Sequence, residues 1–427
     1  MIFLNVIFSI LILIICLRRY KIWSPISFFI IFNISQIISY YIMLVGDDKY
    51  YYFLKTALPI FDIGKNYLIA NYLFLYFSFV ISILFIFFKN KNFNINENLT
   101  NQNLKYNSIN INFFLNFLIL IFFLFFLIFI FDVDIYKFFY YENYLDLNKP
   151  DYVSADLKIS QLFLNSYYFL GVVFIGFYHF LNQSKFFKFI LIILILVTFL
   201  IALAKSSRFF PLLIGFNFAC IILSNSKNNK ISIIAINIIF FFISYFLILY
   251  QRSLNNLGIS QALINTSLMF SDFENFDLTK IFFNITNGMA VFDLTLNFNP
   301  YYSFKHKFLS SLPSISLIDN FDDTPNRITN RLSVIAPFNS FGEAYHYGII
   351  YLSLFILIFI LVLFYVSEQT KKNDFKIYTP SVLLCYFTIL TTSQYNIRTN
   401  SKFIFLAFIL VFLTNLFYQN KKQSLKK

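Results

Sequence analysis

The chain has 427 residues, of which 59% are hydrophobic and only 12% are charged. A soluble domain averages about 25% charged residues, so this composition excludes an ordinary water-soluble protein and predicts an integral membrane protein. The net charge of +13 would suggest nucleic-acid binding in a soluble protein. In a membrane protein its distribution over the two faces matters instead, and we expect no nucleic-acid partner.

Apolar runs long enough to cross a bilayer follow one another along most of the chain. A spanning helix needs about 20 mostly apolar residues. We therefore predict an all-α polytopic membrane protein with about eleven transmembrane helices, ten or twelve remaining open. The predicted spans are 2–17, 24–45, 67–88, 111–131, 161–181, 186–204, 209–224, 231–250, 342–366, 381–395 and 403–418.

A long segment without a span separates the eighth and ninth predicted helices. The prediction thus divides the chain into transmembrane helices 1–8 (residues 1–250), a large periplasmic loop (251–341), and transmembrane helices 9–11 with a cytoplasmic tail (342–427). We expect short amphipathic helices in the loop whose apolar faces pack on the bundle. One such face has Leu263, Leu268, Met269 and Phe273, and the other has Ile281, Phe282, Ile285, Met289 and Phe292.

The charges between the spans predict the orientation of the chain. With an odd number of spans, one side of the membrane holds 17 of the 33 Lys and Arg residues but only Glu97, Glu368 and Asp374 among the acids. Cytoplasmic loops carry the excess of basic residues. We therefore expect the N-terminus outside and the C-terminus in the cytoplasm.

Charged residues gather where the predicted spans end on the outer face. Lys205 and Arg208 lie in a tight turn between two spans, where a pair of cations can hold a phosphate or simply extend to the interface. Arg327 and Arg331 precede the ninth span, and Arg398 lies in the last outer turn. Arginine binds phosphate oxygens in bidentate fashion and stays charged, so these five residues predict a pyrophosphate site.

Two residues at the start of the ninth span are candidates for a catalytic base. Glu343 and His346 are three residues apart, which places them on the same face of a helix. Either side chain can take a proton from an attacking hydroxyl group. The sequence has no Cys/His cluster and no phosphate-binding glycine loop, so we expect no metal and no cofactor.

Together these features resemble the Wzy-type O-antigen and oligosaccharide repeat-unit polymerases. The likeness is carried by the number of spans with one large outer loop, Ser207-Arg208 at an outer turn, the stretch Asn339-Ser-Phe-Gly-Glu-Ala-Tyr-His-Tyr-Gly348, the Arg331-x10-Gly342 spacing and the outer Arg398. It is specific over only about a dozen residues, because polymerases of this type diverge widely.

The resemblance implies an inverting, metal-independent glycosyltransferase in the bacterial inner membrane. Such an enzyme takes undecaprenyl-pyrophosphate-linked glycan as both donor and acceptor and extends O-antigen or capsular polysaccharide at the periplasmic face, with membrane lipid and a chain-length regulator protein as further partners. Lys205, Arg208, Arg327, Arg331 and Arg398 would neutralise the leaving pyrophosphate. Glu343 or His346 would be the base.

Two other functions remain open at this point. An O-antigen ligase has a similar shape but passes the glycan to lipid A core. A lipid-linked oligosaccharide flippase or other transporter would be expected to show charges inside the bundle and two related halves. The predicted spans are almost free of charge, and the polar groups lie at one face, so the sequence favours the polymerase.

Overall fold

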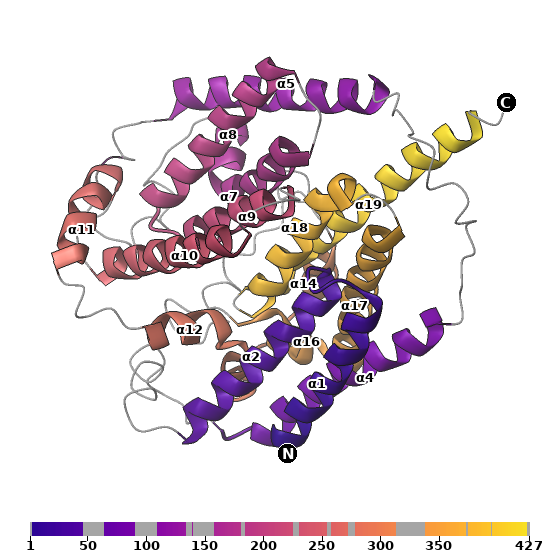
Figure 1. Cartoon of the computed structure of the whole chain (residues 1–427). Helices are drawn as coiled ribbons and strands as arrows, with labels where there is room; N and C mark the ends of the chain where they lie inside the picture. The colour runs from indigo at the N-terminus through magenta and orange to yellow at the C-terminus, as the bar shows by residue number, and fades with distance from the viewer. Residues whose placement is uncertain are drawn as a thin grey trace. The chain divides into compact units, whose positions relative to one another are not determined.

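The structure is a computed structural model that describes residues 2–45, 64–89, 109–133, 139, 158–180, 184–224, 230–253, 258–271, 278–312, 338–372, 375–393 and 395–424 (Figure 1). Every regular element in these ranges is a helix. The helices are α1 (Ile2–Arg19), α2 (Pro25–Val45), α4 (Tyr67–Lys89), α5 (Ile109–Asp132), α7 (Lys158–Phe180), α8 (Lys185–Ala204), α9 (Phe209–Ser224), α10 (Lys230–Ser253), α11 (Ile259–Ser271), α12 (Leu278–Thr286), α13 (Gly288–Thr295), α14 (Phe304–Ser311), α16 (Ser340–Tyr347), α17 (Ile349–Lys372), α18 (Phe375–Thr392) and α19 (Ile397–Ser424).

Six helices in the described ranges are long and apolar enough to cross a membrane: α1, α2, α4, α8, α17 and α19. Shorter apolar stretches occur at Asn116–Asp132, Phe209–Ile221 and Ala235–Gln251. The prediction of an all-helical, membrane-embedded protein is confirmed. Each of the eleven predicted spans overlaps a helix, but the count of eleven and the orientation stay predictions.

The predicted ninth span begins later than expected. Residues 340–347 form the separate helix α16, and the spanning helix α17 starts only at Ile349. Gly348, between them, has φ +125°, a conformation that residues with a Cβ rarely adopt. The helix breaks at this glycine, so α16 can take a direction of its own.

The chain forms two compact units, which are described separately. The first contains residues 1–105 and 282–427, and the second contains residues 106–281. In the first unit, α17 contacts α2, α4, α18 and α19, and α16 packs on α13, α17 and α19. In the second unit, α7 packs on α5, α8 and α9, and α11 lies on α8 and α10.

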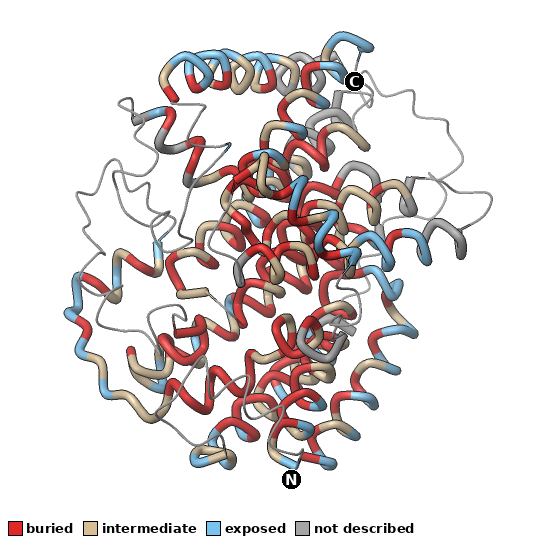
Figure 2. The backbone as a smooth tube through the Cα atoms, turned by 90° about the vertical axis from the view of Figure 1, so that its left-hand side faces the viewer, coloured by how far each residue is buried: buried red, intermediate tan, exposed pale blue. Residues whose placement is uncertain are grey.

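The helix α1 shows how these sequences are placed in lipid. Its buried face includes two polar residues, because Asn5 donates to the carbonyl of Asn71 at 3.2 Å and Ser9 pairs with Ser78 at 3.2 Å. Large apolar residues of α1, including Phe3 and Leu4, are exposed. Figure 2 colours the backbone by burial and shows buried and exposed residues alternating along the helices. Polar side chains between helices and apolar ones outside are typical of membrane helix packing.

The helices of the predicted large loop differ from expectation in two respects. Met269 of α11 is buried, but Leu263 and Leu268 are exposed, so the prediction that they pack inward is wrong, and Phe273 lies outside the described residues. The second predicted helix is two helices, α12 and α13, which are separated at Asn287, directly before Gly288. A Cβ on Gly288 would lie 2.2 Å from Oε1 of Gln36, so only glycine lets α13 approach α2 so closely.

Candidate functional site

Two short helices of the first unit, α14 and α16, build the candidate site. Ser303 caps α14 by accepting from the N–H of His306 at 3.2 Å, and Asn339 caps α16 by accepting from the N–H of Gly342 at 2.7 Å. Asn339 also donates to the carbonyl of Gly288 at 2.8 Å, which ties α16 to α13. Serine and asparagine favour such caps because their oxygens satisfy N–H groups that the helix leaves open.

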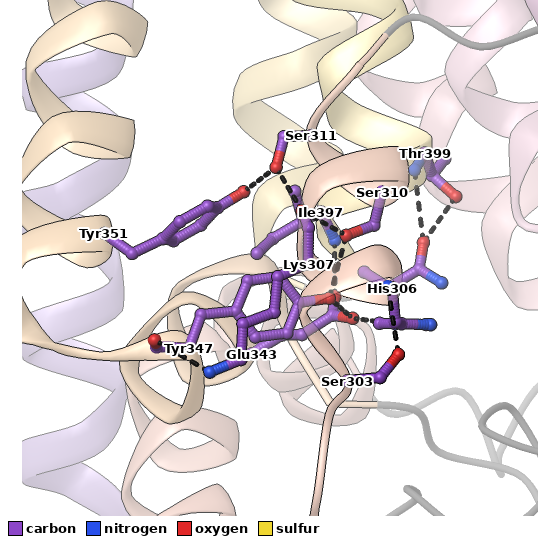
Figure 3. Close-up of polar contacts among 11 residues, drawn as sticks. Ser303, His306, Lys307, Ser310, Ser311, Glu343, Tyr347, Tyr351, Ile397 and Thr399 are labelled. Carbon is purple, nitrogen blue, oxygen red and sulfur yellow. Dashed lines mark hydrogen bonds and ion pairs between the residues drawn. The ribbon is translucent and has the colours of Figure 1, made fainter.

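Glu343 is the centre of a buried polar cluster (Figure 3). Its Oε1 accepts from the Tyr347 hydroxyl at 2.7 Å and lies 3.7 Å from Nε2 of His306. The Tyr347 hydroxyl also bonds with Ser310 at 2.9 Å, and the His306 ring stacks on Tyr302 with 5.1 Å between centroids. We call Glu343, Tyr347, His306, Ser310 and Tyr302 the Glu343 cluster.

Glu343 also holds the start of α19. Its Oε2 accepts from the backbone N–H of Ile397, the first residue of that helix, at 2.7 Å. The first N–H groups of a helix lack internal partners and carry partial positive charge, so a carboxylate there is stabilising. Arg398, the next residue, is buried. Both carboxylate oxygens of Glu343 are therefore committed to structure, and one of them fixes the backbone beside Arg398.

His346 lies on the same helix but has different partners. Its Nε2 is 3.0 Å from the carbonyl oxygen of Thr295. A carbonyl can only accept, so Nε2 carries the hydrogen and Nδ1 keeps its lone pair in the neutral ring. Burial lowers the pKa of His346 below its usual value, although the Thr295 bond and the nearby Glu343 charge oppose the shift. His346 is thus a neutral, oriented, half-buried imidazole at neutral pH.

Lys307 of α14 places a cation at the end of α16. Its Nζ donates to the carbonyl of Tyr347 at 3.2 Å and lies 5.9 Å from the centre of the Tyr347 ring. The Tyr347 hydroxyl donates to Glu343, and burial raises the pKa of Tyr347 far above its ordinary range. Tyr347 therefore stays neutral, and its carbonyl holds the Lys307 ammonium at the last residue of α16.

Two of the other predicted cations, Lys205 and Arg208, belong to the second unit. There the Lys205 ammonium donates to the carbonyl of Leu164 at 2.9 Å and lies 5.4 Å from the Tyr167 ring centre. Burial lowers its pKa to about 8, so most of the ammonium stays charged at pH 7. Arg327 and Arg331 lie outside the described residues.

The turn that carries Lys205 and Arg208 is tightly built. Ser206 has φ +44°, and the N–H groups of Ser206 and Ser207 return to the carbonyls of Leu203 and Ala202 at 2.9 Å each, which is the usual way to end a helix with a left-handed residue. Ser207 accepts from the Tyr167 hydroxyl at 2.6 Å. The turn therefore has a fixed conformation.

Two site residues were missed by sequence reasoning: His306 and Lys307. Both lie in Phe304-Lys-His-Lys-Phe308, which follows the capping Ser303. A basic run with one of only three histidines in the chain, placed directly after a capping residue, is the signal that could have identified them. These two residues lie about 40 positions before α16 in the sequence, so spacing along the chain does not predict their contacts with Glu343 and Tyr347.

The arrangement suits proton transfer. No group of three or more His, Cys, Asp or Glu side chains that could hold a metal occurs among the described residues. The neutral imidazole of His346 can accept a proton, while Lys307 and Arg398 supply positive charge from neighbouring elements.

Comparison with known proteins identifies no relative. No protein-family model, no curated protein and no solved structure matches the chain.

Proposed function

We propose that the chain is a Wzy-type membrane glycosyltransferase that polymerises undecaprenyl-pyrophosphate-linked repeat units, with His346 as the catalytic base. The proposed location is the bacterial inner membrane, with the site on the periplasmic side. The observation that carries the choice of base is the hydrogen bond from His346 to the carbonyl of Thr295, because it leaves Nδ1 free to accept a proton.

In the proposed reaction, a hydroxyl group of the acceptor glycan attacks the anomeric carbon of the donor. The new C–O bond forms as the bond from that carbon to the pyrophosphate oxygen breaks, with inversion. The hydroxyl proton passes to Nδ1 of His346, and the electron pair of the broken bond leaves with undecaprenyl pyrophosphate. A base of this kind contributes roughly 10²–10⁴-fold to a rate.

Glu343 has a positioning role in this proposal rather than that of a base. Its two oxygens already accept from Tyr347 and from the N–H of Ile397. We propose that Arg398 and Lys307 face the pyrophosphate and stabilise the charge that develops on it. Lys205, Arg208, Arg327 and Arg331 keep their proposed phosphate-binding role on the strength of the sequence resemblance alone.

The test compares glycan profiles in a strain that lacks the gene and carries it again as wild type, His346→Gln or His179→Gln. Glutamine at position 346 can still donate to Thr295 but cannot act as a base. His179 is the matched control, because it is another half-buried histidine whose Nε2 has a partner, Asn217 at 2.8 Å. Each variant must reach the membrane at the wild-type level.

We expect His346→Gln to lose the long-chain ladder while single repeat units still reach lipid A core, and His179→Gln to keep the ladder. A normal ladder with His346→Gln would refute the assignment of the base. Long polymer that stays on the lipid carrier in the gene-deleted strain would instead indicate a ligase. An unchanged profile in that strain would remove both enzymatic functions.

A further inference from the structure

Helix α11 has its large apolar side chains on the outside. Leu263, Ile264, Leu268 and Phe270 are exposed by 71%, 52%, 46% and 55%. The face that packs on the second unit is formed by Ala262, Asn265 and Met269. In water, a helix would bury its leucine and phenylalanine residues and expose an asparagine. Helix α11 buries Met269, but it also buries Asn265 and exposes both of its leucines and Phe270, against that expectation.

The polar groups on the exposed face of α11 do not require water. The hydroxyls of Ser267 and Ser271 donate to the carbonyls of Ile264 and Leu268, at 2.7 Å each, and that of Thr266 donates to Ala262 at 2.6 Å. No charged residue occurs between Ile259 and Ser271. In an apolar medium, every polar group must find a partner within the protein, and these hydroxyls do so within their own helix.

The neighbours of α11 show which medium covers this face. Within the second unit α11 packs on α8 and α10, and α8 is a candidate membrane span. The exposed side of α8 is also apolar, with Phe189, Leu196 and Leu200 among its exposed residues. Helix α11 thus packs on a candidate membrane span whose own exposed residues are apolar.

The length of α11 limits how it can lie in the bilayer. Thirteen residues make a helix about 20 Å long, whereas the hydrocarbon core is roughly 30 Å thick. The helix begins shortly after α10, whose residue Gln251 accepts from Ser206 at 3.2 Å. That bond places the end of α10 at the same end of α8 as the turn with Lys205.

We propose that α11 is a membrane-embedded, non-spanning helix whose face of Leu263, Ile264, Leu268 and Phe270 contacts lipid acyl chains. The occupant of the face is lipid rather than a protein partner, because the face carries no charge and belongs to a helix that packs on the candidate membrane span α8. This proposal depends on the membrane location of the chain and is independent of the proposed enzymatic activity.

The experiment measures the accessibility of spin labels on the full chain in phospholipid nanodiscs. A nitroxide is attached to cysteine at one position at a time: Leu263→Cys, Ile264→Cys or Leu268→Cys. The native Cys16, Cys220 and Cys385 are all completely buried, so an unsubstituted chain should take up little label and sets the background. Leu196→Cys on α8 is the lipid-facing reference, and Lys185→Cys at the exposed start of α8 is the aqueous reference.

Oxygen, which concentrates in lipid, and a water-soluble nickel chelate serve as the two relaxation probes. We expect all three α11 positions to match Leu196→Cys, with high accessibility to oxygen and low accessibility to nickel. High nickel accessibility, as at Lys185→Cys, would place the face in water and overturn the proposal. Low accessibility to both probes would mean that protein covers the face and would also overturn it. Three independent positions keep the test decisive if one variant fails to fold.

Discussion

Replacing Glu343 tests whether its carboxylate holds α16, α14 and α19 together. Glu343→Ala removes the oxygens that accept from two buried donors, the Ile397 N–H and the Tyr347 hydroxyl, at 2.7 Å each. The N–H is left without an acceptor, which costs about 1–3 kcal/mol, whereas the hydroxyl keeps its bond with Ser310 and loses one hydrogen bond, worth about 0.5–1.5 kcal/mol. We therefore expect the free energy of unfolding to fall by roughly 1.5–4.5 kcal/mol.

Glu343→Gln is the matched control for this substitution. The glutamine carbonyl can accept from Ile397, and the Tyr347 hydroxyl can turn to accept from the amide while it donates to Ser310. The variant then loses mainly the negative charge at the start of α19, which is worth about 0.3–2 kcal/mol. The expected order of stability is wild type, Glu343→Gln, Glu343→Ala.

The assay is unfolding of the purified chain by titration with a denaturing detergent, including Tyr347→Phe and the double variant. Tyr347→Phe removes the hydroxyl that donates to Glu343. The cost of Glu343→Ala should therefore fall by about 0.5–1.5 kcal/mol in the Tyr347→Phe background. If the free energy of unfolding of Glu343→Ala is within about 0.5 kcal/mol of the wild-type value, a change typical of uninvolved surface positions, then the Glu343 carboxylate does not hold the three helices together.

Two further predictions concern the pH dependence of the reaction and the ion pair between Glu368 and Arg19. Burial lowers the pKa of His346, and the neutral ring is the proposed base. The transfer rate in proteoliposomes should therefore be flat at neutral pH and fall only as the pH drops below the ordinary histidine pKa of about 6.5. A midpoint of the rate profile above that pH would contradict the assignment. Glu368 accepts from the Arg19 guanidinium at 2.5 Å and from the Tyr20 hydroxyl. Glu368→Ala should lower the free energy of unfolding by about 1–3 kcal/mol, because the buried Tyr20 hydroxyl loses its acceptor. Glu368→Gln keeps an acceptor and should cost less, and an equal loss in both variants would contradict this reasoning.

The candidate site was only partly visible in the sequence. Spacing along the chain placed Glu343 and His346 on one face of a helix at the start of the ninth predicted span. The structure has both on one helix, but that helix is the separate α16, which ends before the spanning helix α17 begins. It could not show that Glu343 accepts from the first N–H of α19, 54 residues later, or that His346 bonds to Thr295, 51 residues earlier. The first contact gives Glu343 a structural role, and the second orients the His346 ring that we propose as the base. Both contacts depend on how helices from distant parts of the chain pack.

The sequence by itself determined that this is an all-helical membrane protein, because hydropathy is a local property and a run of about 20 apolar residues has few alternatives to a helix in lipid. It also predicted short helices in the long segment before α16. Only the tertiary structure decided which faces of those helices are buried. Leu263 and Leu268 were expected inside because leucine avoids water, yet beside a membrane span the outside is apolar too, so hydrophobicity alone does not tell inward from outward. That choice follows from packing: Ala262 and Asn265 of α11 lie against the second unit, and the leucines are left to face outward.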